Sequence, residues 1–223
     1  NITGSGTLAR KNAGSQAITD FGTLGLSNSN YTLTGAAGAV TINPATLTVT
    51  ADNASRTYGQ ANPVFTGNVT GFVNGELLAN ATTGTASFSS TATSSSNVGS
   101  YGITGSGLAA NNGNYQFVQA SGNATALTVN PLAVTLTGTR EYDGTTVASS
   151  AILSASNLVS GDTLNITGSG TLAGKNTGSQ AIAGFGSLSL GNNNYTLTGA
   201  SGSVTVNPLA VTLTGTRVYD GTT

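Results

Sequence analysis

Seven carboxylates are the only side chains in this sequence that could supply acid–base chemistry at ordinary pH or hold a metal ion. They are Asp20, Asp52, Glu76, Glu141, Asp143, Asp162 and Asp220. Histidine and cysteine are both absent, so the commonest general base and the best nucleophile are missing. A Ser-His-Asp arrangement therefore cannot form, and any catalysis would have to use paired carboxylates.

Glu141 and Asp143 are the closest pair of carboxylates, and on a strand they would share one face, as a glycosidase pair could. Asp143 precedes Gly144, however, which is typical of a turn. In a second copy of the same motif Val218 stands in the place of Glu141. We therefore expect that the protein is not an enzyme.

Calcium is the one cofactor that the composition leaves open, because extracellular arrays often place oxygen ligands between their units. The sensible ligands are Asp52, Asp143 and Asp162. The Asp-x-Asp-x-Asp-Gly spacing of a calcium loop is absent. We expect no resident cofactor, with these three aspartates as the candidate ligands if calcium is bound.

The charge content argues against two classes of partner. Charged residues make up 6% of the chain, against roughly 25% in a typical soluble domain. The net charge is −1 and the six basic residues form no cluster, so neither nucleic acid nor an anionic membrane surface is an expected partner. No apolar run approaches the roughly 18 residues of a spanning helix, so we expect no membrane insertion.

Internal repeats dominate the sequence. Residues 1–44 and 165–208 are identical at 33 of 44 positions, at an offset of 164. Residues 132–146 and 209–223 differ at one position, at an offset of 77. Two kinds of repeat therefore alternate, and we expect the chain to be a piece of a longer array.

An Asn-Pro dipeptide closes each repeat. The three junctions are Asn43-Pro44, Asn130-Pro131 and Asn207-Pro208. Apolar positions alternate on both sides of each junction but change phase across it, which moves the buried set to the opposite face of an extended strand. This pattern predicts stiff joints in a rod; an ordinary linker is the alternative.

Tyrosines stand before or within the expected turns. They are Tyr31, Tyr58, Tyr115, Tyr142 and Tyr195. We expect them to be core or corner anchors, each with one hydrogen bond from its hydroxyl group.

The fold class follows from period-two alternation. Leu47, Val49 and Ala51 alternate with threonines, as they would in half-buried strands. The sequence predicts an all-β protein of small tandem domains in a linear array, each an immunoglobulin-like sandwich or, as the alternative, a β-grasp-like mixed sheet. Helical signal is limited to residues 75–80 and 147–158.

Several of these segments resemble known repeat families. LAVTLTGTREYDGTT (132–146), SGDTLNITGSGTLAGKNTGSQ (160–180) and NNNYTLTGASGSVTVNP (192–208) resemble the YDG-type repeat of large exported bacterial adhesins. ATLTVTADNASRTYGQANPVFTGNVTGFVNGE (45–76), VGSYGITGSG (98–107) and NYQF (114–117) resemble the companion MBG-type repeat. Arrays of this kind look like filamentous-haemagglutinin-type exoproteins.

The resemblance implies a domain organisation. Residues 1–44 would be the C-terminal part of a YDG-type repeat, and residues 45–131 an MBG-type repeat. Residues 132–208 would be a YDG-type repeat, and residues 209–223 the first strand of a further repeat.

The resemblance also implies a function and a location. We expect a structural segment of the stalk or fibre of a bacterial adhesin, secreted or on the cell surface, whose partners are neighbouring repeats of its own chain. One alternative is a subunit of a self-assembling extracellular filament, which would bind other copies. A second is a glycan-binding module that uses its Thr-x-Thr strand faces on host or surface glycans.

Overall fold

The structure, a computed structural model, describes residues 1–223 and divides into two compact units. The first unit contains Asn1–Arg56, Asn62–Thr93 and Gly99–Thr128. The second contains Thr57–Ala61, Ser94–Val98 and Val129–Thr223. Two short segments of the second unit therefore belong, by sequence, to the repeat expected over residues 45–131.

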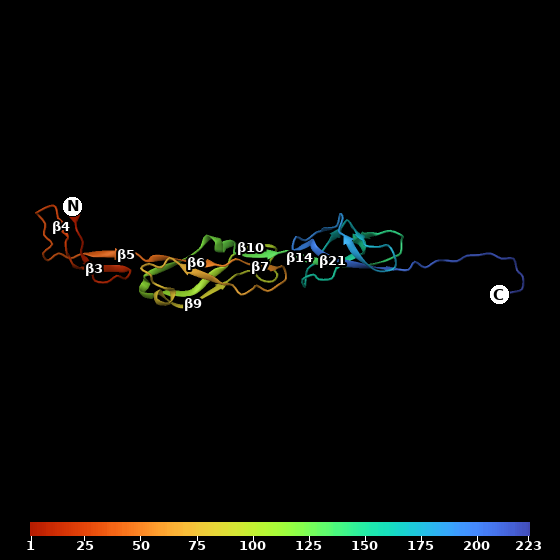
Figure 1. Ribbon diagram of the computed structural model, residues 1–223, viewed down its shortest axis with the longest axis horizontal. Helices are drawn as coiled ribbons and strands as arrows, with labels where there is room; N and C mark the ends of the chain where they lie inside the picture. Colours follow the sequence, from red (N-terminus) through yellow and green to blue (C-terminus); the bar gives the residue numbers. More distant parts are fainter. The chain divides into compact units, whose positions relative to one another are not determined.

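Strands are the main elements of both units (Figure 1). Those that lie or begin in the first unit are β1 (Ile2–Thr3), β2 (Thr7–Leu8), β3 (Gly14–Asp20), β4 (Gly25–Leu26), β5 (Ala39–Ile42), β6 (Ala45–Ala51), β7 (Ala54–Thr57), β8 (Gly67–Thr70), β9 (Thr82–Ser89), β10 (Gly99–Tyr101), β11 (Thr104–Ala110), β12 (Tyr115–Gln119) and β13 (Leu127–Asn130). Those of the second are β14 (Leu132–Glu141), β15 (Val147–Ser149), β16 (Leu153–Ala155), β17 (Ile166–Thr167), β18 (Ser169–Leu172), β19 (Gly178–Gly184), β20 (Ser189–Leu190) and β21 (Tyr195–Asn207).

Helical elements are short. They are the α-helix α1 (Leu78–Ala81) and the 3₁₀ turns η1 (Asn111–Gly113), η2 (Ser121–Thr125) and η3 (Ser150–Ile152). None of the helices has the length and apolar character that crossing a bilayer requires. The predicted all-β class is confirmed.

Residues 45–131 and residues 132–208 each contain one parallel strand pair. In the first unit β6 runs parallel to β12, with Ala45 opposite Tyr115, and antiparallel to β8. In the second unit β14 runs parallel to β21, with Leu132 opposite Tyr195 and Glu141 opposite Asn207. The strand that follows Asn-Pro thus pairs with the strand that begins at Asn-Tyr.

The sheet of the second unit has six strands in the order β15-β18-β19-β21-β14-β16. Its outer pairings are antiparallel, so the sheet is mixed. A mixed sheet with a parallel pair is what the β-grasp-like alternative predicts. An immunoglobulin-like sandwich is not established by these pairings.

Alternating residues of the central strands form the cores. Val134 and Leu136 of β14 and Val204 and Val206 of β21 are all fully buried. In the first unit Leu47 packs with Ala81 and Tyr115, and a second cluster gathers around Ile103 and Leu127. β-branched and leucine side chains at every second position are therefore what hold each sheet together.

Burial changes phase across Pro131 as predicted. The buried side chains before it are Leu127 and Val129, and those after it are Val134 and Leu136. The set switches from odd to even positions, so an extended chain turns the opposite face inward after the proline.

One local prediction was wrong. Residues 147–158, which carried a weak helical signal, form β15, η3 and β16 instead, because both short strands find pairing edges, on β18 and β14.

Residues 209–223 form no strand in this structure, so their assignment to a further repeat stays a prediction. A single strand without a partner cannot satisfy its backbone groups and is not stable on its own.

Candidate functional site

The same side-chain hydrogen bonds recur at the Asn-Tyr dipeptides where the parallel strands start. We call Asn30-Tyr31, Asn114-Tyr115 and Asn194-Tyr195 the Asn–Tyr corners. In two of them, at Tyr115 and Tyr195, the tyrosine is buried and both side chains are hydrogen-bonded. Tyr31 is 71% exposed.

In the first unit the Tyr115 hydroxyl group is held from two sides. The backbone N–H of Val73 donates to it at 3.1 Å, and the hydroxyl donates to Glu76 Oε2 at 2.7 Å. The ring lies edge-on to Phe72, with centroids 5.9 Å apart. Lys11 Nζ lies 3.9 Å from the other oxygen of Glu76.

In the second unit Tyr195 repeats this arrangement. The backbone N–H of Val159 donates to its hydroxyl oxygen at 2.8 Å, and the hydroxyl donates to Asp162 Oδ2 at 2.7 Å. Tyr58 donates to the same carboxylate oxygen at 2.8 Å and packs edge-on against Tyr195, with centroids 5.6 Å apart. In both units the carboxylate comes three residues after the donating N–H.

The asparagine of each corner binds a second loop. Asn114 Oδ1 accepts the N–H of Ala13 at 2.8 Å, and its Nδ2 donates to Asn12 Oδ1 at 3.3 Å. Asn194 Oδ1 accepts the N–H of Val98 at 2.9 Å, and its Nδ2 donates to Asn97 Oδ1 at 2.9 Å. The two corners therefore make the same pair of bonds to an Asn-x dipeptide.

The loops that receive the corners share a short motif. They read Asn12-Ala13-Gly14-Ser15 and Asn97-Val98-Gly99-Ser100, and the same pattern recurs as Asn176-Thr177-Gly178-Ser179. We call these the N-x-G-S loops. The glycine has a positive φ in all three, 107°, 152° and 105° respectively, a conformation that favours glycine. The Asn–Tyr corners and the N-x-G-S loops thus each occur three times along the chain.

The Asn-Pro junctions lie next to the corners in the backbone hydrogen-bond network. The N–H of Leu132, just after Pro131, donates to the carbonyl oxygen of Asn194 at 2.9 Å. The N–H of Tyr58 donates to the carbonyl oxygen of Asn130 at 2.8 Å. Equivalent bonds join Ala45 to Asn114, and Tyr142 to Asn207. Asn130 and Asn207, which precede Pro131 and Pro208, therefore each accept a backbone hydrogen bond through the carbonyl group.

Burial next to a carboxylate keeps these tyrosines protonated. Burial, followed by the hydrogen bond to Asp162, raises the pKa of Tyr195 to about 12, although the Val159 N–H opposes the shift. The hydrogen bond to Asp162 raises the pKa of Tyr58. For Tyr115 the Val73 N–H lowers the pKa, but burial and Glu76 together raise it overall. The hydroxyl groups act as hydrogen-bond donors.

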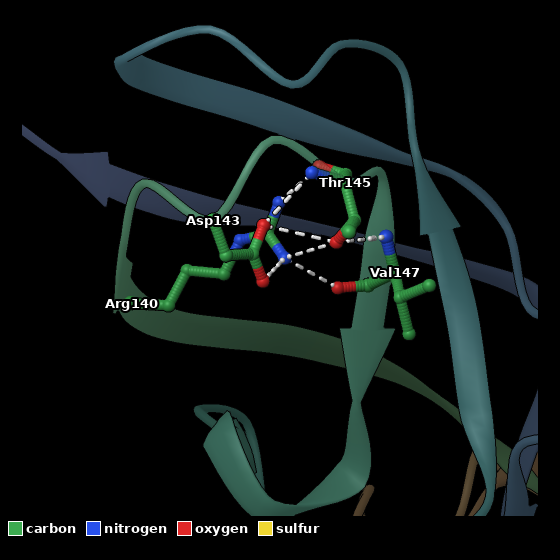
Figure 2. Close-up of polar contacts among 4 residues, drawn as sticks. All are labelled: Arg140, Asp143, Thr145 and Val147. Atoms are coloured by element: carbon green, nitrogen blue, oxygen red, sulfur yellow. Dashed lines mark hydrogen bonds and ion pairs between the residues drawn. The ribbon is translucent and has the colours of Figure 1, made fainter.

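The Arg-x-Tyr-Asp-Gly-Thr-Thr turn is a separate, self-contained motif (Figure 2). Arg140 Nη1 donates to Asp143 Oδ2 at 2.9 Å and to the Val147 carbonyl oxygen at 2.9 Å, and Nη2 donates to the Thr145 carbonyl oxygen. Asp143 Oδ1 accepts both the N–H and the hydroxyl of Thr145 at 2.9 Å. The Thr145 N–H and, less strongly, Arg140 lower the pKa of Asp143.

The candidate calcium ligands are engaged in other bonds. Asp52 accepts the hydroxyl of Thr66 at 2.7 Å, Asp143 closes the turn with Arg140, and Asp162 accepts from two tyrosines. The structure contains no group of three or more carboxylates that could hold a metal ion. These three aspartates are hydrogen-bond acceptors within the fold.

The structure places the other predicted residues as follows. Tyr58, Tyr115 and Tyr195 are buried, Tyr142 is half-buried and Tyr31 is exposed. Sequence reasoning missed the acceptors of the tyrosine hydroxyl groups, Glu76 and Asp162, as a matched pair. A signal was present, because Val73-Asn-Gly-Glu76 and Val159-Ser-Gly-Asp162 share one pattern.

Comparison with known families matches two parts of the chain. Residues 47–125 match the MBG domain (YGX type), and residues 123–204 match the YDG domain. No curated protein and no solved structure matches the chain. The chain therefore carries an MBG domain of the YGX type followed by a YDG domain, which confirms the resemblance that its repeat signatures indicated.

Proposed function

We propose that this chain is a structural segment of the stalk or fibre of a bacterial cell-surface adhesin. MBG and YDG domains are found in repeat-containing surface proteins. In this role the protein acts outside the cell, and its partners are the neighbouring repeats of its own chain. The stiff joints expected at the Asn-Pro junctions are part of the proposal.

The observation that carries the proposal is the corner of Asn194 and Tyr195. The N-x-G-S loop that it binds, at Asn97, belongs by sequence to the preceding repeat. Asn114 binds Asn12 in the same way, again in the preceding repeat. A contact that recurs at successive repeats is what a load-carrying array requires, because each repeat of such an array is stabilised by its neighbours.

A display experiment tests the stalk. In cells that carry the full-length protein, residues 45–208 are deleted in one strain and replaced by an unrelated rigid segment of equal length in another. A stalk predicts that the deletion reduces adhesion by shortening reach and that the replacement restores it. Adhesion lost in both strains would show that the segment itself binds the ligand, as the glycan-binding alternative requires. Antibody labelling of intact cells tests the surface location.

The self-assembling filament is a second candidate, because one observation favours it. The six-stranded sheet of residues 132–208 ends in the strands β15 and β16, and neither edge strand contains a charged residue or a proline. An open edge of this kind is a template for another chain.

A further inference from the structure

The first and last strands of the repeat at residues 132–208 are hydrogen-bonded to each other. β14 is the first strand and β21 is the last, and they run parallel over nine paired positions. At one end of this ladder Leu132 lies opposite Tyr195. At the other end Glu141 lies opposite Asn207. The chain therefore enters the repeat at one end of the ladder and leaves it at the other.

This arrangement determines how the repeat responds to tension along the chain. Tension pulls β14 by its N-terminal end and β21 by its C-terminal end, so the two strands are drawn past each other along their length. The hydrogen bonds of a parallel ladder are evenly spaced, so all of them are loaded together, in shear. A ladder that is pulled open from one end would instead lose its bonds one after another.

The other strands of this sheet are not needed to carry the load. β16 pairs with the other edge of β14, and β19 pairs with the other edge of β21, both in antiparallel orientation. The inward side chains of the two loaded strands are buried, at Val134, Leu136, Val204 and Val206. The face of the ladder that carries these side chains is therefore shielded from water, which would otherwise compete for its hydrogen bonds.

The repeat at residues 45–131 pairs its first and last parts in the same way, but with an interruption. β6 runs parallel to β12 as far as Val49 and Gln119. The 3₁₀ turn η2 then separates β12 from β13. Beyond the turn, the N–H of Ala54 donates to the carbonyl oxygen of Ala126 at 2.8 Å, so the two parts are bonded again.

One buried side chain fills the interruption. Asn123 lies in η2 and is 4% exposed. Its Oδ1 accepts the N–H of Ala51 at 2.8 Å, and its Nδ2 donates to the carbonyl oxygen of Val49 at 3.0 Å. Nδ2 also donates to Gln119 Oε1 at 2.9 Å. A single amide group thus makes the bonds to β6 that a longer β12 would make.

We propose that the repeats at residues 45–131 and 132–208 are shear clamps, which keep their fold under tension along the chain. The clamp of residues 132–208 is the pair β14 and β21. That of residues 45–131 is the pair β6 and β12, continued by the side chain of Asn123. Bearing tension is an activity of the fold itself, and its use in the cell rests on the proposed stalk.

The clamp and the stalk can fail separately. Force measurements on the chain test the clamp, whereas deletion and replacement of the segment on cells test the stalk. A chain that unfolds at low force would overturn the clamp and leave the stalk standing as a spacer. A strong clamp in a segment that binds the ligand itself would leave the clamp standing without the stalk.

Single-molecule force spectroscopy of the whole chain tests the clamp. Because the chain has no cysteine, two engineered thiols define the points between which it is pulled. The variant N130C/T223C applies the load before β14 and after β21, and so shears the ladder. The variant E141C/T223C applies the load at Glu141 and, through the tail, at Asn207, which lie opposite each other. It therefore opens the same ladder from one end.

The two attachment variants are matched in everything except the direction of the load. All three substituted residues are exposed, so the interior is unchanged and equal urea midpoints are expected. Since forced unfolding is governed by the unfolding rate, N130C/T223C should unfold at a mean force at least about twofold higher at the same loading rate. Equal forces for the two variants would overturn the clamp.

A second pair of variants tests Asn123. Its control is Asn157, whose Oδ1 accepts the N–H of Thr135 at 2.8 Å and whose Nδ2 donates to the carbonyl oxygen of Ala133 at 2.9 Å. Asn157 follows β16, so it binds β14 on the edge away from β21. The two asparagines thus make the same kinds of bond, but only those of Asn123 belong to a clamp.

The two asparagine variants should differ under load although both lower the urea midpoint. N123A, pulled through N43C and T128C, should unfold about tenfold faster at constant force, because two bonds between the sheared parts are lost. N157A, pulled through N130C and T223C, should unfold at the wild-type rate. An unchanged rate in N123A, or an equal increase in N157A, would overturn the role of Asn123. The comparison of attachment points leaves the interior intact, so it decides the clamp even if N123A does not fold.

Discussion

Tyr195 and Asp162 are joined by a 2.7 Å hydrogen bond, and Tyr115 and Glu76 are joined by another of the same length. In each case a valine N–H completes the environment of the hydroxyl group. Two repeats of different type thus hold the first residue of β12 or β21 by the same arrangement, a buried phenol between a carboxylate and a backbone donor. Five predictions follow from this device and its surroundings.

Removing the Tyr195 hydroxyl group should destabilise the second unit. In Y195F the Val159 N–H loses its acceptor and Asp162 loses one donor, which should lower the free energy of unfolding by about 1–3 kcal/mol. Urea denaturation followed by circular dichroism measures this loss. The control is Y31F, because Tyr31 is exposed; equal midpoints for the two variants would contradict the assigned role.

The stability of the second unit should fall at alkaline pH. Folding raises the pKa of Tyr195 from 10.0 to about 12, so folding favours the neutral phenol. The resulting stabilisation is fully present below pH 10 and is lost as the pH rises from 10 to about 12. Unfolding free energies measured across this range should decline in the wild type and decline less in Y195F. Identical slopes in both proteins would assign the alkaline loss to other groups.

Arg140 should not be replaceable by lysine. Its side chain is 8% exposed and bonds to Asp143, Thr145 and Val147, which a lysine ammonium cannot reproduce with one point charge. R140K should lose about 0.5–1.5 kcal/mol of unfolding free energy for each hydrogen bond that is not remade, because its acceptors are on exposed residues. The matched control is R217K in the second copy of the motif, where the side chain is 54% exposed and little change is expected. If R217K lost as much unfolding free energy as R140K, the burial of the Arg140 guanidinium group would not explain the effect.

Gly59 should be intolerant of a side chain. A Cβ atom there would lie 2.5 Å from Val159 Cγ2, and its φ is +86°. Gly144 has a φ of +76° but nothing within 4 Å of a Cβ atom. G144A therefore measures the backbone cost alone, about 1 kcal/mol, and G59A should cost more by about 1–3 kcal/mol of overpacking. Equal thermal midpoints for the two variants would show that Val159 moves aside.

Asn194 should control the opening of the N-x-G-S loop at Asn97. N194A removes the acceptor of the Val98 N–H, so the Val98 amide should exchange with solvent about tenfold faster or more. N193A is the control, because Asn193 is exposed in the same turn. Hydrogen exchange measured by NMR resolves the single amide. Unchanged protection of the Val98 amide in N194A would show that the Asn194 side chain does not hold the loop closed.

Much of the fold follows from local pattern, but strand pairing does not. The alternation of Leu47, Val49 and Ala51 indicates a strand whether its neighbour is parallel or antiparallel, so the parallel partner β12 was not foreseeable. Residues 132–141 and 209–218 make the point more sharply. Almost the same ten residues form β14 in one place and no strand in the other, because a strand exists only with a partner.

The candidate site was predictable in part. The Asn-Tyr dipeptides and the anchoring role of the tyrosines are visible in the sequence. Their acceptors were missed because a carboxylate such as Asp162 lies 33 positions from Tyr195, and a lone aspartate suggests a metal ligand or a turn as readily as a phenol acceptor. The N-x-G-S loops were missed because serine, glycine and asparagine are common throughout the chain, which hides a four-residue pattern.

The corners and N-x-G-S loops also bear on how such a gene can change. Asn114 and Asn194 belong to repeats of different type, yet each binds an Asn-x dipeptide through the same atoms. Recombination that inserts, removes or reorders whole repeats would leave every corner facing a loop of compatible chemistry. The length of the array can then drift between lineages without new compensating mutations at the joints, so that repeat number becomes a trait on which selection acts directly.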